Sequence, residues 1–470
     1  MQSQNHLHKE YHALSSARAA RRSWQRSQVR WLLILGDLAL VNLVAFGALW
    51  LGVQRSVWWL AVASWDIFLV WFIFLSALWF VMAQILDLYD LRIAALPRRA
   101  VRGALLAILG VFAVYLLLYF IAAPQTLPRH LIMFFALPAA FVLTLWRGGF
   151  ALAVGAGPLA RRVAIVGGGD SARALADALR EHAPNYYRVV AQFDSLGAPE
   201  AARQIDAAQL DEALVSAAAD WDDEWLALLA AWREQGVQIV NLAAVFEELT
   251  GRVPVEYVGK TWSVLLPWEQ DATRGLNGLA KRACDIIFSA LALLLLAPFL
   301  PLLALAVRLD SRGAILLRQT RVGQNGRVFV LYKFRSMIAE AESPGAPQWA
   351  APDDPRVTRV GKFLRRFKLD ETPQFWNVLR GEMALVGPRP ERPEIVENLQ
   401  RAIPFYRLRH VVRPGLTGWA AIRFPYGRSV HDALVKLQYD LYYIKHQSAS
   451  LDALILFKTL GAVLTPPRAP

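Results

Sequence analysis

The chain has 470 residues, too many for one ordinary domain, and 56% of them are hydrophobic against 19% that are charged. An ordinary soluble domain is roughly 45–50% apolar and about 25% charged, so this composition excludes intrinsic disorder and argues against a purely soluble enzyme, while the single cysteine excludes a disulfide framework. The net charge of +13 fits either nucleic acid or an anionic membrane surface with phosphorylated ligands.

Four long apolar runs occupy the first third of the chain, at residues 31–53, 67–88, 103–123 and 131–154. Each is near the ~20 residues that a helix needs to cross a bilayer core, and the 17 tryptophans fit membrane interfaces. Buried helices of a large soluble protein are the weaker alternative, and a cleavable signal peptide fits poorly because the first run is about twice as long as a signal core. We predict a basic tail over residues 1–30 and a four-helix transmembrane anchor over residues 31–155.

Positive charges gather in alternate loops of this anchor. Six lysines and arginines precede the first run and four lie between the second and third runs, whereas the other two loops carry Arg55 and Arg129 alone. Arg161 and Arg162 follow the fourth run. Under the positive-inside rule, both ends of the anchor face the cytoplasm, and the chain after residue 155 starts there.

A strand, a glycine turn and a helix are predicted directly after the anchor. Residues 162–166 are a β-branched run that ends in a turn with Gly167 and Gly169, which is how a Rossmann βαβ unit begins, with amides aimed at a phosphate. Further strands are expected at 189–193, 212–216 and 237–242, giving a Rossmann-like α/β domain over 156–265 and a linker over 266–280. Gly167 and Gly169 form a weak candidate nucleotide turn, with Asp194 where a ribose-binding carboxylate would lie. The strands are too few for a full dinucleotide fold, so a module without bound nucleotide is favoured.

A second membrane element is predicted over residues 283–308, where the run from Asp285 to Val307 is apolar after Asp285 with only Ser289 polar. Pro298 removes a backbone donor near its centre, so a kink is expected there. Both flanks of this segment are basic. A helix pair that enters and leaves the membrane by the same face would explain this. A fifth true span is the alternative, and it would export everything after Arg308.

Two adjacent carboxylates, Asp370 and Glu371, begin a predicted short helix within residues 368–381. Asp370 is expected as the N-cap, with Pro373 in the first turn and Gly381 just past the end. The helix dipole would then keep both carboxylates ionised, helped by three cations at Arg365, Arg366 and Lys368. One ionised carboxylate could attack phosphorus while the second binds a divalent ion. Ordinary helix capping with a salt bridge is an alternative of equal weight.

Arginines and lysines recur in Gly- and Pro-rich turns and nearby segments around this helix. Arginine is the residue of choice for bidentate phosphate contacts, so these cations together favour an anion site over a merely solvated basic face. No recognisable nucleic-acid-binding motif accompanies them, and nucleic acid is not an expected partner.

Six motifs stand in order between Lys281 and Gly418. They are Lys281-Arg282-x-x-Asp285, Lys333-Phe334-Arg335-Ser336-Met337, Leu369-Asp370-Glu371-x-Pro373-Gln374, Asn377-Val378-x-x-Gly381-x-Met383, Gly387-Pro388-Arg389-Pro390 and Arg413-Pro414-Gly415-Leu416-Thr417-Gly418. They resemble the monotopic polyprenyl-phosphate phosphoglycosyl transferases. The whole chain is similar to the large bacterial members that initiate capsule and exopolysaccharide synthesis, and the tail over 409–452 is similar to the exopolysaccharide subgroup.

The resemblance implies transfer of a sugar 1-phosphate from a UDP-sugar to undecaprenyl phosphate, at the cytoplasmic face of the bacterial inner membrane. It implies Asp370 as the nucleophile that releases UMP, Glu371 as the residue associated with Mg²⁺, and Pro298 as the break of a re-entrant helix. Phosphate- or substrate-binding positions fall on its motifs at Lys333, Arg335, Gln374, Asn377, Arg389 and Arg413. The chain departs from the family pattern at Ala297, where Ser is usual, and at Ala421, where many members carry Gln.

The predicted fold class is therefore a membrane protein of α plus α/β class, with a mostly helical catalytic domain over 281–470. Two other functions stay open: an NAD(P)-dependent sugar-nucleotide modifying enzyme centred on Gly167, and a non-catalytic scaffold of polysaccharide assembly. Membrane lipids are expected partners. The sugar, with glucose and galactose both fitting, and the oligomeric state, a homodimer included, stay open as well.

Overall fold

The computed structural model describes residues 26–55, 65–121, 129–155, 160–167, 169–193, 200–201, 205, 209–216, 221–256, 275–338, 354–424, 427 and 429–464. The chain divides into two units, Met1–Thr250 and Gly251–Pro470, which are described separately. Asp194, most of the predicted basic tail and most of the predicted linker lie outside the described residues.

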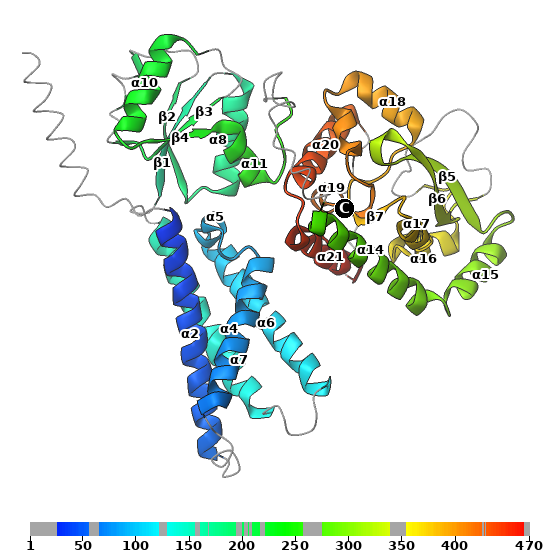
Figure 1. Ribbon diagram of the computed structural model, residues 1–470, viewed down its shortest axis with the longest axis horizontal. Coiled ribbons are helices and arrows are strands. Elements are labelled where there is room, and N and C mark those ends of the chain that lie inside the picture. The colour runs from blue at the N-terminus through cyan, green and yellow to red at the C-terminus, as the bar shows by residue number, and fades with distance from the viewer. Residues whose placement is uncertain are drawn as a thin grey trace, which may run out of the picture. The chain divides into compact units, whose positions relative to one another are not determined.

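Four long helices begin the first unit and run side by side (Figure 1). They are α2 (Arg26–Arg55), α4 (Trp65–Ile85), α6 (Pro97–Ile121) and α7 (Arg129–Gly155), with the short α5 (Leu91–Ala94) before α6. Among the described residues, three stretches are long and apolar enough to cross a membrane: Gln28–Ala48, Pro97–Leu118 and Phe135–Val154. The apolar stretch Phe72–Ile85 of α4 is shorter. The chain is thus a membrane protein with three candidate spans in this part, where the sequence predicted four.

Small residues allow these helices to approach one another closely. Ala45, Ala104, Ala107 and Ala139 are fully buried between them, whereas most of the large leucines point outward. A side chain at Gly36 would collide with the ring of Trp146, at 2.4 Å. This division is typical of membrane helices, whose interfaces are packed by small residues because lipid is as apolar as leucine.

An ion pair between Asp37 of α2 and Arg147 of α7 is buried inside this bundle. The Asp37 carboxylate also accepts hydrogen bonds from the indole nitrogens of Trp79, at 3.3 Å, and Trp146, at 3.1 Å. Arg147 donates to the carbonyl of Leu88 as well. The two charges that interrupt the apolar runs therefore neutralise each other and join α2, α4 and α7.

A four-stranded parallel sheet follows, in the order β2-β1-β3-β4. Its strands are β1 (Arg161–Val166), β2 (Tyr187–Phe193), β3 (Glu212–Val215) and β4 (Gln238–Asn241), and its helices are α8 (Asp170–His182), α10 (Asp223–Glu234) and α11 (Leu242–Thr250). The predicted strands are all present. Alternate residues of β1 enter different hydrophobic clusters, because successive strand side chains point to opposite faces.

The glycine turn after β1 has a structural explanation. Gly167 has φ 118° and Gly169 has φ 87°, values that side chains other than glycine rarely adopt. A Cβ at Gly167 would lie 2.6 Å from the Cβ of Ser216, the residue after β3. Close packing of two parallel strands therefore accounts for Gly167 without a nucleotide.

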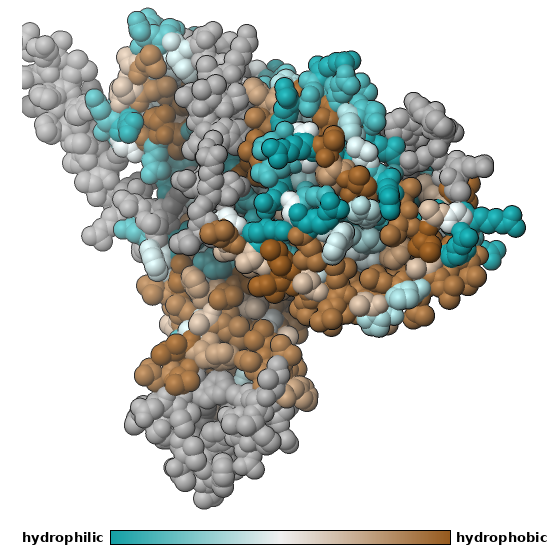
Figure 2. Space-filling view, turned by 45° about the vertical axis from the view of Figure 1, so that its right-hand side comes forward, coloured by the Kyte–Doolittle hydropathy of each residue, from teal (hydrophilic) through white to brown (hydrophobic). Residues whose placement is uncertain are grey.

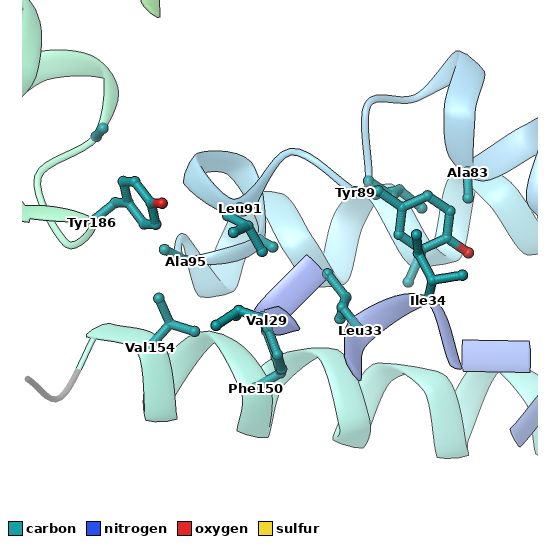
Figure 3. Close-up of a cluster of buried hydrophobic side chains, with 14 of the residues drawn as sticks. Val29, Leu33, Ile34, Ala83, Tyr89, Leu91, Ala95, Phe150, Val154 and Tyr186 are labelled. Atoms are coloured by element: carbon teal, nitrogen blue, oxygen red, sulfur yellow. The ribbon is translucent and has the colours of Figure 1, made fainter. Parts of the chain in front are cut away.

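The sheet domain and the membrane helices share one hydrophobic cluster within this unit. Leu33 of α2, Val154 of α7 and Tyr186, which precedes β2, belong to it (Figure 3). Asn185 donates a hydrogen bond to the carbonyl of Ala95 at 3.2 Å, and Arg92 lies 3.4 Å from Glu248 of α11.

The second unit starts with a bent pair of helices, α14 (Gly275–Leu296) and α15 (Leu300–Asp310). The bend is 64°, at a break that contains Pro298, so the predicted kink is confirmed. Many of their large apolar side chains are exposed, including Phe288, Leu294 and Leu309, and hydrophobic side chains gather along this edge of the unit (Figure 2).

Helices and two small sheets build the rest of this unit. Strands β5 (Leu316–Val322) and β6 (Val328–Phe334) are antiparallel, and β7 (Ala384–Val386) and β8 (Gly415–Thr417) are parallel. The helical elements are η2 (Gln324–Gly326), α16 (Arg359–Arg366), η3 (Leu369–Glu371), α17 (Gln374–Arg380), α18 (Pro393–Ala402), η4 (Tyr406–His410), α19 (Trp419–Arg423), α20 (Val430–Lys445) and α21 (Ala449–Leu464).

Candidate active site

Asp370 and Glu371 lie in the 3₁₀ turn η3, which ends at Glu371, shortly before α17 begins at Gln374. The prediction that Asp370 caps that helix is wrong, since the cap position is taken by Pro373. An N-cap carboxylate accepts from amides two or three residues later, and Pro373 has no amide hydrogen to donate. The predicted end is confirmed, because Gly381 follows α17 with φ 80°.

Asp370 is 9% exposed, and its Oδ1 atom is buried without a hydrogen-bond partner. Burial and the neighbouring Glu371 carboxylate raise its pKa above the usual value, against the opposing charges of Lys368, Arg365 and Lys333. This corrects the expectation that a helix dipole and nearby cations would favour ionisation of both carboxylates. The Asp370 carboxyl group is thus desolvated and lies among cations.

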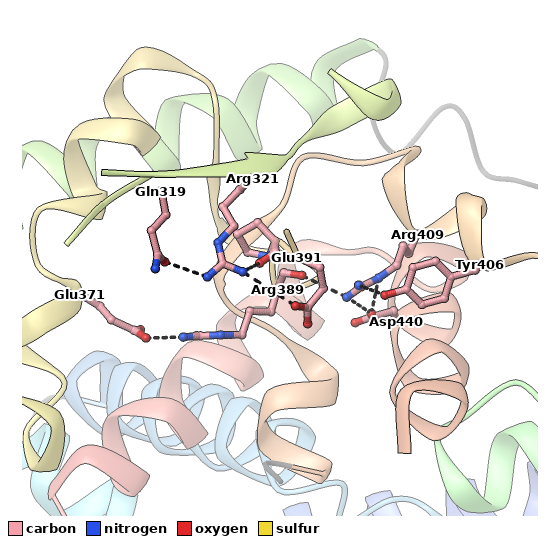
Figure 4. A network of polar contacts seen from close by, with 9 residues as sticks. Gln319, Arg321, Glu371, Arg389, Glu391, Tyr406, Arg409 and Asp440 are labelled. Carbon is pink, nitrogen blue, oxygen red and sulfur yellow. Dashed lines mark hydrogen bonds and ion pairs between the residues drawn. The ribbon is translucent and has the colours of Figure 1, made fainter. Parts of the chain in front are cut away.

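The Glu371 side chain, 13% exposed, forms an ion pair with Arg389, whose side chain is 55% exposed (Figure 4). Burial acts to raise the pKa of Glu371, but the charge and hydrogen bond of Arg389, together with Lys368 and Lys333, outweigh it and hold that pKa below its usual value. Adjacent carboxylates therefore have opposite pKa shifts. Such a division suits two different chemical roles.

Lys333 stands near the end of β6, where its charge acts on both carboxylates. Arg365 of α16 acts on Asp370 in the same way, and its Nε donates to the Ser336 hydroxyl at 2.8 Å. The structure thus brings Lys333 and Arg389 to the acidic pair, as the sequence predicted. Segments about 55 residues apart in the chain meet here.

Three other predicted binding residues are engaged in the fold. Asn377 is fully buried; its amide nitrogen donates to the Val330 carbonyl and to Glu382, both at 2.7 Å, and its oxygen accepts from the Tyr332 amide at 3.2 Å. Arg335 is buried and donates to the carbonyl of Ser311 at 2.6 Å, at the end of α15. Gln374 is buried as well. These contacts fasten β6 and the bent helix pair to the rest of the unit.

The Lys-Arg-x-x-Asp motif docks α14 onto the acidic-pair region. Arg282 donates to the last carbonyls of α17, at 2.7 and 2.8 Å, and Asp285 accepts from the Leu385 amide at 3.0 Å. Lys281 donates to Asp452 of α21 at 2.6 Å and to the Val386 carbonyl at 3.2 Å. Helix α14 is therefore fastened to the helix that follows Asp370.

The two Gly-Pro turns predicted to hold arginines pack against each other. A Cβ at Gly415 would lie 2.1 Å from the Gly387 amide nitrogen, and one at Gly387 would lie 2.4 Å from the Arg413 carbonyl. Only glycine permits this approach. The charge of Arg413 acts on Arg282, which places Arg413 near the end of α17.

A buried group that sequence reasoning did not single out supports Arg389. Arg409 donates to the Arg389 carbonyl at 3.1 Å, to Asp440 at 2.8 Å and to the Tyr406 hydroxyl at 2.7 Å (Figure 4). Arg409 and Asp440 are both almost fully buried. The sequence feature that could have pointed to these two residues is the resemblance of the tail over 409–452 to the exopolysaccharide subgroup. Their pairing is expected once both are buried, because a buried charge needs a partner.

The oxygen donors here fit one kind of metal site. No group of three or more His, Cys, Asp or Glu side chains that could hold a metal occurs among the residues that the structure describes. Mg²⁺ is commonly bound through one or two carboxylates plus substrate phosphates and water, rather than in a protein cage. Glu371, whose side chain is 13% exposed, is such a carboxylate.

Comparison with known proteins gives a consistent picture. Residues 276–466 match the family described as bacterial sugar transferase. The UDP-N-acetylgalactosamine-undecaprenyl-phosphate N-acetylgalactosaminephosphotransferase of Aeromonas hydrophila is 40% identical over 247 residues, 52% of this chain and 57% of that protein. The undecaprenyl-phosphate glucose phosphotransferase of Komagataeibacter xylinus is 37% identical over 320 residues, 64% of this chain and 59% of that protein.

A shorter relative is covered almost completely. The exopolysaccharide production protein PSS of Rhizobium leguminosarum bv. phaseoli is 41% identical over 190 residues, 39% of this chain and 95% of that protein. The chain matches less than two thirds of the length of the Aeromonas and Komagataeibacter proteins.

Proposed function

Because the chain belongs to the bacterial sugar transferase family, we propose that it transfers a sugar 1-phosphate from a UDP-sugar to undecaprenyl phosphate, as the first membrane step of exopolysaccharide synthesis. The observation that carries the proposal is the adjacent pair Asp370 and Glu371, with opposite pKa shifts, among Lys333, Lys368 and Arg389. The names of the relatives support the acceptor and the phosphosugar.

In the first step the ionised Asp370 carboxylate attacks the sugar-bearing phosphorus of the UDP-sugar. A bond forms between Oδ1 and phosphorus, the phosphoanhydride bond breaks, and its electron pair leaves with UMP. In the second step an oxygen of undecaprenyl phosphate attacks that phosphorus, and the bond to Asp370 breaks to regenerate the carboxylate. Oδ1 accepts no hydrogen bond, so no hydrogen bond has to break before this oxygen attacks.

The surrounding residues stabilise the negative charge of this reaction. Lys333, Lys368 and Arg365 place positive charge beside Asp370, which favours approach of the anionic substrates. Arg389 orients Glu371, and its exposed guanidinium is available to phosphate oxygens from the solvent side. Mg²⁺, which Glu371 would hold, would neutralise part of the phosphate charge when bound.

The membrane elements support the same reaction. We further propose that α14 and α15 form a re-entrant helix that enters and leaves one leaflet at the cytoplasmic face of the inner membrane. Arg282 connects α14 to α17, so the acidic pair would lie at the depth of the lipid phosphate. The N-terminal helices would form a four-helix anchor, and the parallel sheet a Rossmann-like domain.

Release of UMP tests the proposal. Purified full-length protein is incubated with undecaprenyl phosphate, Mg²⁺ and, in turn, UDP-glucose, UDP-galactose and UDP-N-acetylgalactosamine. We expect UMP from at least one donor, and a loss on the order of a thousandfold or more in Asp370→Asn, because the amide is not a nucleophile. Asp177→Asn, at an exposed position of α8, is the matched control and should keep full activity. Equal UMP release from wild type and Asp370→Asn would refute the assignment.

A further inference from the structure

Helix α16 and the residue that follows it carry cations and aromatic rings on one exposed face. The outer face of α16 consists of five residues at the spacing of a single helical face, all of them exposed: Arg359, Lys362, Phe363, Arg366 and Phe367. Phe363 and Phe367 are 53% and 39% exposed, and their ring centroids lie 5.0 Å apart. Exposed aromatic rings that gather beside cations indicate an interaction surface.

The opposite face fixes how α16 lies on the second unit. Leu364 is fully buried in a cluster with Val307 of α15 and Phe334 of β6. A Cβ at Gly361 would lie 2.0 Å from the carbonyl oxygen of Ser336, so the helix rests directly on that segment. These contacts hold α16 in one orientation, and the exposure of the outer face is therefore a property of the fold.

Helix α16 begins beside the end of the bent helix pair (Figure 1). The Val360 amide donates at 2.9 Å to the carboxylate of Asp310, the last residue of α15. Leu302, Leu305 and Leu309 of α15 are exposed. If the bent pair enters and leaves one leaflet as proposed, the outer face of α16 lies where α15 returns to the headgroup layer.

The cations of the outer face are available to an anionic partner. Arg359 and Lys362 form no ion pair with the residues that the structure describes, and Arg366 lies over the ring of Phe367 at 5.7 Å. From residue 354 to residue 368 the only acidic residue, Asp354, is buried and accepts from Arg356 at 2.8 Å. Cations attract any anion, but exposed phenyl rings between them are typical of a helix that lies on an anionic membrane.

We propose that the outer face of α16 binds anionic phospholipid headgroups of the bilayer. Arg359, Lys362 and Arg366 contact lipid phosphates, and the two phenyl rings insert between the headgroups. This contact would hold the inner side of α16, whose Arg365 acts on Asp370, against the membrane surface. The inference rests on the proposed placement of α14 and α15 in one leaflet, and not on the transfer reaction.

Hydrogen–deuterium exchange of the full-length protein in nanodiscs tests this surface without any sugar donor. The nanodiscs contain phosphatidylcholine alone, phosphatidylcholine with phosphatidylglycerol, or phosphatidylcholine with undecaprenyl phosphate. Amides of α16 should exchange about fivefold more slowly with phosphatidylglycerol than with phosphatidylcholine alone, the effect of roughly one cation at an anionic surface. High salt should remove this difference. Equal exchange in these two nanodiscs would overturn the proposal, and slower exchange with undecaprenyl phosphate alone would assign the surface to the acceptor instead.

Matched triple variants separate the outer face from net charge. Combining Arg359→Gln, Lys362→Gln and Arg366→Gln should remove the effect of phosphatidylglycerol on α16. The control combines three exposed arginines outside α16, as Arg327→Gln, Arg401→Gln and Arg407→Gln, and should keep that effect. Thermal unfolding shows whether each variant is folded. The same loss of the effect in both folded triple variants would overturn the proposal.

Exchange in α15 tests the membrane placement separately. This helix carries no charge before Arg308, so inside a leaflet it should exchange slowly in all three nanodiscs, whatever the lipid charge. Fast exchange of α15 would overturn the placement together with the inference that rests on it. Slow exchange of α15 with equal exchange of α16 would overturn the lipid surface alone, and an absence of UMP release would concern only the transfer reaction.

Discussion

Single residues of the acidic pair differ because their surroundings differ. Asp370 lies beside cations without contacting one through a hydrogen bond, and its pKa is raised by burial and by Glu371. Glu371 contacts Arg389 directly, and its pKa is lowered. In the mechanism that we propose, only the ionised form of Asp370 attacks phosphorus. As the solution is acidified, activity should therefore begin to fall at a higher pH than it would with an aspartate of ordinary pKa.

Arg389→Gln should raise the pKa of Glu371, because burial then acts on a carboxylate that has lost its counter-charge. The contribution of the ionised Glu371 is present above its folded-state pKa and lost as the pH falls through it, so the acidic limb of the pH–rate profile should move to higher pH. We expect UMP release near neutral pH to fall by about tenfold or more, the size of a charge-assisted hydrogen bond.

Two further variants serve as controls for the pH–rate profile of Arg389→Gln. Arg389→Lys keeps the charge and should return the acidic limb toward the wild-type position while recovering part of the rate. Arg401→Gln removes an exposed arginine paired with Glu397 on α18 and should leave the profile unchanged. A profile of Arg389→Gln that coincides with wild type would show that the ion pair has no part in catalysis.

Among the secondary-structure elements, α14 connects the acidic-pair region to the apolar bent pair that it forms with α15. Its first turns contact α17, β7 and α21 through Lys281, Arg282 and Asp285. Tyr443 of α20 adds a hydrogen bond to Asp452 at 2.8 Å and one to the Val386 carbonyl at 3.1 Å. The element is thus held by polar contacts on one side and presents apolar side chains on the other.

Asp452→Asn should loosen this attachment, since the ammonium group of Lys281 loses its charge partner in a mostly buried position. We expect a destabilisation of about 1–3 kcal/mol and a reduced rate of UMP release, measured by thermal unfolding and by the transferase assay on the same sample. Lys281→Met with Asp452→Leu removes both charges and should be less destabilising than the single change. Unchanged stability in Asp452→Asn would show that the pair does not hold α14.

At the scale of the whole molecule, each of the two units contains a buried ion pair with a different role. In the first unit the buried Asp37–Arg147 pair lies among apolar helices, where an uncompensated charge is costly. In the second unit the buried Arg409–Asp440 pair supports the turn of Arg389. The first pair joins helices, and the second positions a side chain of the site.

The two single changes in the membrane pair should be more harmful than the double change. Asp37→Leu and Arg147→Leu each leave a buried charge without its partner and should destabilise the protein by about 3–5 kcal/mol, whereas Asp37→Leu with Arg147→Leu should recover much of that loss. Thermal unfolding of the four proteins in one detergent measures this. If the double variant is as unstable as the sum of the single variants, the two residues act independently.

The sequence by itself determined the features that depend on neighbouring residues. Hydropathy located three candidate spans, Pro298 located the break between α14 and α15, and Gly381 located the end of α17, because each property belongs to a short segment. The predicted strands of the parallel sheet are present for the same reason. The acidic pair was found as a candidate site because its two carboxylates are adjacent in the chain.

Only the tertiary structure decided what those residues contact. It paired Glu371 with Arg389, used Arg335 and Asn377 to hold the fold, and placed Arg409 and Asp440 behind the turn of Arg389. It also showed that Asp370 caps no helix and that its pKa is raised. These outcomes depend on distance, burial and charge between segments far apart in the chain, which no local pattern contains.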